Sequence, residues 1–141
     1  HHVAILMEMM HETRIIPLTS RASAGPTLRS NLGDSYGHWD GDTLVVETTN
    51  FRRSSNFSGA SNSLRLVERF TRVEPDTLQY EFTMNDPSTW TKPWTARIYM
   101  QPAPGTGVIY EFACHEGNYA IANTLRGARL QEQQNVRNSS R

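Results

Sequence analysis

The stretch that decides the fold is LRLVERFTRVEPDTLQYEFTM, residues 64–84. Apolar and polar side chains alternate on both sides of the tripeptide EPD, whose composition is typical of a tight turn. Side chains two residues apart lie on the same face of a strand. The pattern therefore predicts an antiparallel hairpin in which Phe70 faces Tyr80 and Arg69 faces Glu81.

Further strands are predicted upstream of this hairpin. Residues 42–51, DTLVVETTNF, are rich in β-branched side chains and follow a Gly-Asp turn signal. Residues 3–10 and 14–18 are predicted to form a hairpin, although the first of them also contains good helix formers. Residues 20–36 and 52–63 are polar and are predicted as loops.

A second hairpin is predicted downstream, with strands over 94–100 and 107–114 around the turn PAPGTG. Its register would set Arg97 opposite Glu111, so that both hairpins place opposite charges across neighbouring strands. Those Arg and Glu residues are accordingly expected to have a structural role.

One helix is predicted at the C-terminal end, over residues 118–134. Ile121, Leu125 and Ala128 follow a helical spacing, and Asn118 is a suitable N-cap. Residues 131–141 are polar and are expected to fray. The fold class expected is all-β, an antiparallel meander that is barrel-like or calycin-like with one C-terminal helix, in a single β-rich domain over residues 1–141.

The composition excludes several classes of function. The chain has 141 residues, with 14 Lys+Arg against 14 Asp+Glu, and this zero net charge argues against a nucleic-acid-binding module with a basic face. The single cysteine excludes an intrachain disulfide and a Cys-rich zinc site. No stretch approaches the ~20 apolar residues of a transmembrane helix, and the glycine-rich nucleotide-binding and G-x-S-x-G hydrolase motifs are absent.

Four segments resemble one family of proteins. They are MEMMHETRIIPL (7–18), GHWDGDTLVVETTNF (37–51), LVERFTRVEPDTLQYEFTMNDPSTWTKPW (66–94) and YEFACHEGNY (110–119). Together they are similar to an uncharacterised family of secreted bacterial proteins from soil Acidobacteria and some Proteobacteria. The resemblance implies a periplasmic or secreted location and a chain that forms the C-terminal part of a longer protein. It implies no catalytic residue, because the family has no assigned activity.

A metal site is one candidate for chemistry. His11, His38 and His115 are the internal histidines, and three imidazoles with a carboxylate such as Glu116 would suit zinc, copper or non-haem iron. No recognised metal motif connects them, so three unrelated histidines are the simpler interpretation. Cys114 lies beside His115, but strand neighbours point to opposite faces, which argues against a Cys–His nucleophile pair.

A buried carboxylate is a second candidate. In the register of the first hairpin, Glu68 shares the apolar face with Leu66, Phe70 and Phe82. A desolvated carboxylate in that position suits a general acid or base, as Glu116 would in the metal-dependent alternative. The structural alternative is that Glu68 pairs with an arginine that points into the same face, or accepts hydrogen bonds from backbone N–H groups at the mouth of the barrel.

A ligand site on the apolar face is the third candidate, and it is the leading functional prediction. Aromatic side chains on this face would line a site for a small apolar or aromatic ligand. The residues expected to line it are Tyr80, Phe82, Trp94, Tyr110 and Glu68. Two alternatives remain open: an accessory or structural subunit of a larger extracytoplasmic complex, and a metal-dependent enzyme that uses His11, His38 and His115.

Overall fold

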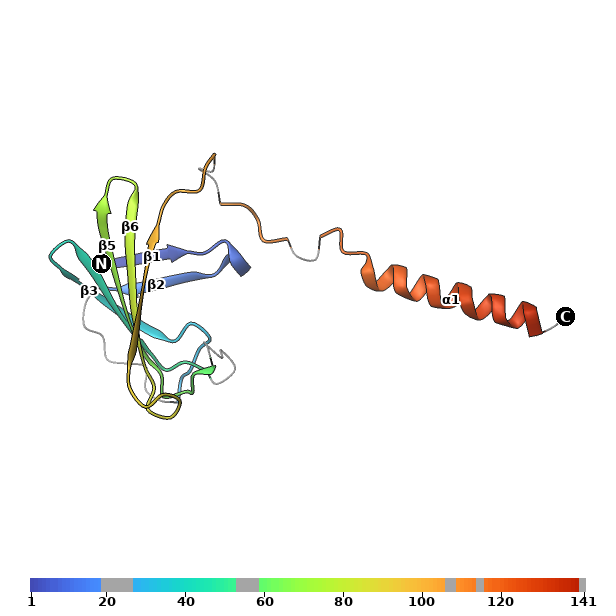
Figure 1. Cartoon of the computed structure of the whole chain (residues 1–141), viewed down its shortest axis with the longest axis horizontal. Coiled ribbons are helices and arrows are strands. Elements are labelled where there is room, and N and C mark those ends of the chain that lie inside the picture. The colour runs from blue at the N-terminus through green and yellow to red at the C-terminus, as the bar shows by residue number, and fades with distance from the viewer. Residues whose placement is uncertain (19–26, 53–58, 106–108, 114–115, 140–141) are drawn as a thin grey trace. The chain divides into compact units, whose positions relative to one another are not determined.

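The computed structural model describes residues 1–18, 27–52, 59–105, 109–113 and 116–139 (Figure 1). The chain divides into two compact units, His1–Tyr110 and Glu111–Arg141. All seven strands lie in the first unit, and the helix α1 lies in the second. The expected fold class is therefore confirmed: the described chain is antiparallel β structure with one C-terminal helix.

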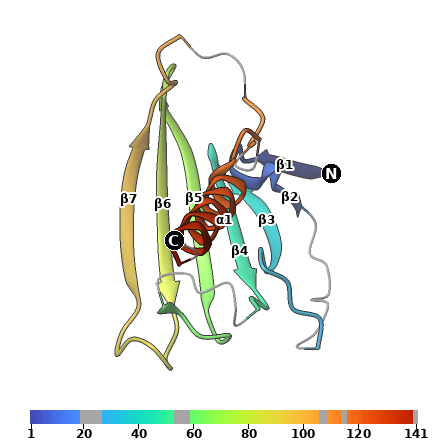
Figure 2. The same ribbon diagram turned by 90° about the vertical axis from the view of Figure 1, so that its right-hand side faces the viewer.

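The main element is a five-stranded antiparallel sheet with the order β3-β4-β5-β6-β7. Strands that are neighbours in the sequence are neighbours in the sheet, so the topology is a simple meander. The sheet is open, with β3 at one edge and β7 at the other (Figure 2). Its strands are β3 (Asp34–Asp40), β4 (Thr43–Thr49), β5 (Arg65–Glu74), β6 (Thr77–Asn85) and β7 (Trp94–Met100).

The first predicted hairpin is confirmed in its strands and in its register. Phe70 faces Tyr80 and Arg69 faces Glu81 across β5 and β6. A β-bulge interrupts the ladder near the turn, between Arg72 and Glu74. The alternation in the sequence was sufficient here because a shift of one residue would turn every apolar side chain of the strand to the other face.

The second predicted hairpin is wrong. The described residues 109–113 form no strand, and β7 pairs with β6, so that Arg97 faces Glu81 instead of Glu111. Arg97 donates to Glu81 from Nε at 3.0 Å and from Nη2 at 2.7 Å. The predicted Arg97–Glu111 pair is therefore wrong: Glu111 lies in no strand, and the arginine uses Glu81 of β6.

The strand β3 was missed: Asp34–Tyr36 fall in a segment predicted as a loop, and no strand was predicted over residues 37–40. Polar contacts hold this strand: the hydroxyls of Ser35 and Thr48 lie 2.8 Å apart on paired residues of β3 and β4. The two-residue turn that follows has Gly41 at φ +58°, a conformation that glycine adopts without steric cost. The Gly-Asp signal thus closes a hairpin as well as starting β4.

The N-terminal hairpin is confirmed, with β1 (His2–Leu6) paired to β2 (Thr13–Pro17) in a separate two-stranded sheet. The first strand is shorter than predicted, because a 3₁₀ turn over Met9–His11 connects the two strands. β2 lies beside β3 in both views (Figures 1 and 2). Ile16 from β2 is fully buried against Leu44 and Val46 of β4.

A second core cluster lies toward the other end of β5 and β6. It consists of Phe51, Leu64, Leu66 and Met84, and the half-buried Trp90 and Trp94 pack against it. Burial of each large apolar side chain contributes about 1.5–3 kcal/mol, so these two clusters supply the main favourable term for the sheet. The two tryptophans therefore contribute to the core of this unit, and each keeps part of its surface exposed.

Asp86 connects the loops around this second cluster. Its side chain is almost completely buried and accepts hydrogen bonds from the Ser61 backbone N–H at 2.5 Å and the Ser61 hydroxyl at 2.9 Å. It also accepts from the Thr89 hydroxyl at 2.9 Å and the Ser88 N–H at 3.1 Å. Desolvation by burial raises the pKa of Asp86, but these hydrogen bonds outweigh it and hold the pKa below the ordinary value of 3.8.

The second unit contains α1 (Ala120–Ser139), whose side chains are all exposed. Asn118 accepts a hydrogen bond from the Ala120 N–H at 3.2 Å, as expected of an N-terminal cap. The helix runs five residues beyond the predicted end at Gln134, so residues 131–139, predicted as a tail, are helical. No described helix is long and apolar enough to cross a membrane.

A substitution at Gly37 tests the packing of the small sheet on the large one. A Cβ atom added there would lie 2.9 Å from Ile16 Cγ2 and 3.2 Å from the Val45 carbonyl oxygen. We expect Gly37→Ala to lower the free energy of unfolding by about 1–3 kcal/mol in urea denaturation, because Ile16 is fully buried and must shift. Gly127→Ala in α1, where the new Cβ meets open space, is the control and should leave the β unit unchanged.

The hydrogen-bonded Asp86 carboxylate leads to a prediction about how the free energy of unfolding changes with pH. We expect Asp86→Asn to cost about 1.5–3 kcal/mol at pH 7, the loss typical of hydrogen bonds to a charged group. A carboxyl whose pKa is lowered by folding stabilises the native state above its unfolded pKa, and that contribution is lost as the pH falls through the folded pKa. The stability difference between wild type and variant should therefore shrink below about pH 4. A difference that stays constant down to pH 2 would contradict this account.

Candidate functional site

The two faces of the five-stranded sheet differ sharply in character. We call inner the face onto which β2 packs, and this face carries the side chains of Leu66, Glu68 and Phe70 from β5. Residues that pair across neighbouring strands lie on the same face. The register therefore places six residues of β6 and β7 on the inner face as well: Tyr80, Phe82, Met84, Trp94, Ala96 and Ile98. The opposite, outer face carries ion pairs: Arg65–Glu47, Arg69–Asp40 and Arg97–Glu81.

Glu68 lies on the inner face with a side-chain exposure of only 3%, as the alternation in β5 predicted. It is paired there with Arg14 of β2. The guanidinium donates from Nη1 to Oε1 at 3.0 Å and from Nη2 to Oε2 at 2.6 Å, which is a bidentate contact. This is the arrangement that the structural alternative for Glu68 required.

Three further groups complete the cluster around this pair. The Tyr80 hydroxyl donates to Glu68 Oε1 at 2.9 Å, and Arg14 Nη2 also donates to Thr48 at 3.2 Å and to Ser35 at 3.3 Å. Burial, followed by the negative charge of Glu68, raises the pKa of Tyr80 far above its usual value. Tyr80 therefore stays protonated and remains a donor to the carboxylate.

The cluster has a clear consequence for chemistry. The two oxygens of this carboxylate already accept two guanidinium N–H groups and a phenol, and the residue is buried, so Glu68 is poorly placed to contact a substrate. The same contacts cancel its charge, so Glu68 does not prevent an apolar molecule from lying on the neighbouring rings. The geometry thus favours a structural role for Glu68 over acid–base catalysis.

The rings of the inner face form a continuous row. Phe70 stacks on Tyr80 with ring centroids 4.8 Å apart, and Tyr80 stacks on Phe82 at 5.4 Å. Phe82 meets Trp94 edge to face at 5.7 Å, and Trp94 meets Trp90 in the same way at 5.5 Å. These separations are favourable for aromatic pairs, so the row is preorganised. We refer to Phe70, Tyr80, Phe82, Trp94 and Trp90 as the aromatic row.

The inner face is covered over only part of its width. The side chains of the β1–β2 hairpin pack on β4 and reach Phe70 of β5. The hairpin does not cover the side chains on β6 and β7. Three of these are half-buried, namely Tyr80, Phe82 and Trp94, and two of β7, Ile98 and Met100, are 47% and 41% exposed. Within the described residues of the first unit, the half of the face formed by β6 and β7 is therefore open and apolar.

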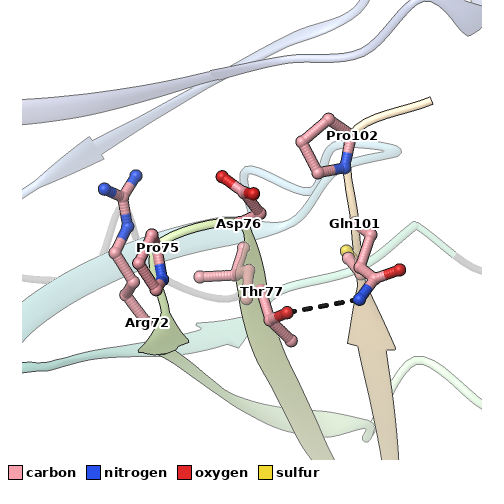
Figure 3. A pocket seen from close by; sticks show the side chains of 8 residues that line it. Arg72, Pro75, Asp76, Thr77, Gln101 and Pro102 are labelled. Atoms are coloured by element: carbon pink, nitrogen blue, oxygen red, sulfur yellow. Dashed lines mark hydrogen bonds between the residues drawn. The ribbon is translucent and has the colours of Figure 1, made fainter. Parts of the chain in front are cut away.

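A pocket of about 260 Å³ lies at one end of this open half (Figure 3). Leu78 and Met100, which face each other across β6 and β7, form its apolar part. Its polar part includes Thr77 and Gln101, and the Gln101 amide donates to the Thr77 hydroxyl at 3.4 Å. Arg72, Pro75, Asp76 and Pro102 complete the lining, from the β5–β6 turn and the end of β7.

Four of the five residues predicted to line a ligand site share the inner face. Glu68, Tyr80, Phe82 and Trp94 are all there, and ring contacts or hydrogen bonds connect them. Tyr110 is the exception, because it lies beyond β7 in a segment without strand structure and is 61% exposed. Its predicted position depended on the second hairpin, which the structure does not contain.

The predicted metal ligands lie in different parts of the chain. His11 is exposed in the 3₁₀ turn of the small sheet, and His38 is exposed on the outer face of β3. His115 and Cys114 lie outside the described residues, and Glu116 is exposed in the turn that precedes α1. Within the described part of the chain, no three His, Cys, Asp or Glu side chains are grouped so as to hold a metal ion.

Sequence reasoning missed Arg14, although it allowed for an inward-pointing arginine of unknown position. The available signal was its place in β2: Arg14 and Ile16 are two residues apart, so both point to the face of β2 that packs on the large sheet. Comparison with protein-family models, curated proteins and solved structures found no match. The site is therefore interpreted from its own geometry.

The Arg14–Glu68 pair yields a stability prediction. Arg14→Met should cost about 3–5 kcal/mol in urea denaturation at pH 7, because it leaves the Glu68 carboxylate buried without its counter-charge. The double variant Arg14→Met, Glu68→Met should recover much of that loss, since it leaves no buried charge. Arg97→Met, which breaks an exposed pair on the outer face, is the control and should change little. Equal losses for Arg14→Met and Arg97→Met would contradict the assignment.

Proposed function

We propose that this chain is an exported binding module for a small apolar or aromatic ligand. The ligand lies on the open half of the inner face, against Tyr80, Phe82 and Trp94. The observation that carries the proposal is the aromatic row, whose rings are held in place by one another and by the core yet remain partly exposed. Rigid, half-exposed rings favour binding because little conformational entropy is lost when a ligand covers them.

The polar groups beside the row support the same proposal. The Tyr80 ring contributes to the row, while its hydroxyl is already bound to Glu68. A ligand that covers this ring therefore leaves no new donor unsatisfied, which would otherwise cost about 1–3 kcal/mol. The pocket beside Leu78 and Met100 extends the apolar surface along β6 and β7 and supplies a boundary for the ligand.

The exported location is proposed from the resemblance to a family of secreted bacterial proteins. A periplasmic or secreted binding module would meet small molecules that enter the cell envelope. The role of accessory subunit in an extracytoplasmic complex is a second candidate. It is favoured by the exposure of Ile98, Tyr99 and Met100 on β7, at 47%, 59% and 41%. Side chains of this size on an edge strand are also suited to contact with another protein.

The binding proposal is tested with N-phenyl-1-naphthylamine, a neutral aromatic probe whose fluorescence rises in apolar sites. We expect saturable binding to the wild-type chain. Ala96→Glu should weaken it at least about tenfold, because Ala96 faces Phe82 on the inner face and a carboxylate there must lose its hydration when the probe binds.

Gln79→Glu is the matched control for that experiment. It adds the same charge in the same sheet, but on the outer face beside Tyr80, and should leave the affinity unchanged. Circular dichroism must show that both variants keep the sheet. Equal weakening by the two substitutions, or the absence of saturable binding to the wild type, would reject the aromatic row as the site.

A further inference from the structure

The strand β7 is an edge that the described part of the chain leaves uncovered. Trp94–Met100 form the last strand of the sheet, and among the described strands only β6 is paired with it (Figure 2). The other edge differs, since β2 of the small sheet contacts β3. An unpaired strand edge presents a row of free backbone N–H and C=O groups, which is a template for a further strand.

The edge lacks the features that usually protect such strands. Proteins block free edges with proline, lysine or a bulge. The sequence WTARIYM contains neither proline nor lysine, and the β6–β7 ladder runs from Leu78–Met100 to Met84–Trp94 without a register shift. Its one charge, on Arg97, is directed at Glu81 within the same sheet and also interacts with Tyr99 of the same strand.

We propose that β7 pairs with β7 of a second copy of this chain, antiparallel and about a two-fold axis perpendicular to the sheet. Such pairing joins two five-stranded sheets into one continuous sheet of ten strands. Because the axis is perpendicular to the sheet, both inner faces lie on the same side, and the open apolar halves become contiguous. This interface does not depend on the proposed ligand.

The register of this pairing follows from the pleat and from charge. Residues that face each other across an antiparallel pair lie on the same face of the sheet, so inner residues must oppose inner residues. Centring the axis on Ile98 sets Ile98 opposite its own copy and Ala96 opposite Met100. Centring it on Arg97 would set two arginines directly opposite each other, which is unfavourable.

The register centred on Ile98 also provides a complementary outer pair. It sets Arg97 of each copy opposite Tyr99 of the other, twice in the dimer. Tyr99 already interacts with Arg97 of its own strand through its side chain, but the residue is 59% exposed, so its ring can also receive the guanidinium of the other copy in a favourable cation–π contact. Axes centred on Tyr99 or Ala96 preserve the faces as well. The Tyr99 axis lies one residue from the end of β7 and leaves fewer residues paired. The Ala96 axis sets Arg97 opposite Thr95, which offers no ring to the guanidinium.

Cysteine cross-linking tests the register. In a Cys114→Ser background, Ile98→Cys should form a disulfide-linked dimer on mild oxidation, because directly opposed Cβ atoms lie about 4.5–5.5 Å apart. Ala96→Cys is the control. Its own copy lies four residues away along the strand, roughly 14 Å, which is too far for a disulfide. Cross-linking of both variants alike, or of neither, would overturn the proposed register.

Charge substitution at Tyr99 tests the interface in solution by sedimentation equilibrium. We expect the wild-type chain to dimerise reversibly. Tyr99→Lys brings an ammonium opposite Arg97 of the second copy, whereas Tyr99→Glu brings a carboxylate there; both remove the same ring from an exposed outer position. The lysine variant should dissociate at least about tenfold more readily than the glutamate variant, and added salt should narrow this difference.

Two outcomes of the sedimentation experiment would reject the proposal. The first is a wild-type chain that stays monomeric up to millimolar concentration, whether or not it binds a different protein. The second is equal association of the two Tyr99 variants. Binding of N-phenyl-1-naphthylamine is measured separately on the same variants, so a failure of the dimer and a failure of the ligand site are distinguishable.

Discussion

The buried pair between Arg14 and Glu68 is the interaction on which the arrangement of this unit depends. It is the one ion pair of the described residues that connects the small sheet to the large one, and it lies on the inner face, where most side chains are apolar. A buried ion pair adds little net stability by itself, since desolvation offsets much of the attraction. Its contribution is to the specificity of packing. Only one placement of β2 on the large sheet brings Arg14 to Glu68, and any other placement would leave a buried charge without its partner, which is costly.

That constraint divides the inner face into two halves with different uses. On the covered half, the hairpin β1–β2 buries Ile16 against β4 and brings Arg14 to Glu68. On the open half, the aromatic row continues onto β6 and β7, and no described hairpin of the first unit packs on it. Tyr80 connects the covered half and the open half, because its hydroxyl donates to Glu68 while its ring stacks on the partly exposed Phe82. The element that fixes the fold therefore also prepares the surface proposed for the ligand.

The strand β7 takes part in both the proposed ligand surface and the proposed dimer interface. Its inner side chains, such as Ile98, border the proposed ligand surface, and its free backbone edge borders the proposed dimer interface. These uses are compatible in space, because a ligand would approach perpendicular to the sheet whereas a second copy would approach within its plane. Arg97 stays on the outer face, held by Glu81, and so interferes with neither. A meander that ends on an apolar strand thus offers two distinct directions of contact.

The sequence by itself determined the strands with strict alternation and the register of the β5–β6 hairpin, because one face of each strand must be buried and a slip of one residue would expose it. It also placed Glu68 among apolar side chains. Only the tertiary structure decided which arginine would meet Glu68 and which glutamate would meet Arg97, since electrostatic attraction has no preferred sequence separation and several partners were available. Tyr110 and the segment around it show the same limit. The alternation over residues 107–114 predicted a strand, but the described residues 109–113 form none, and Arg97 finds its partner Glu81 on the opposite edge of β7.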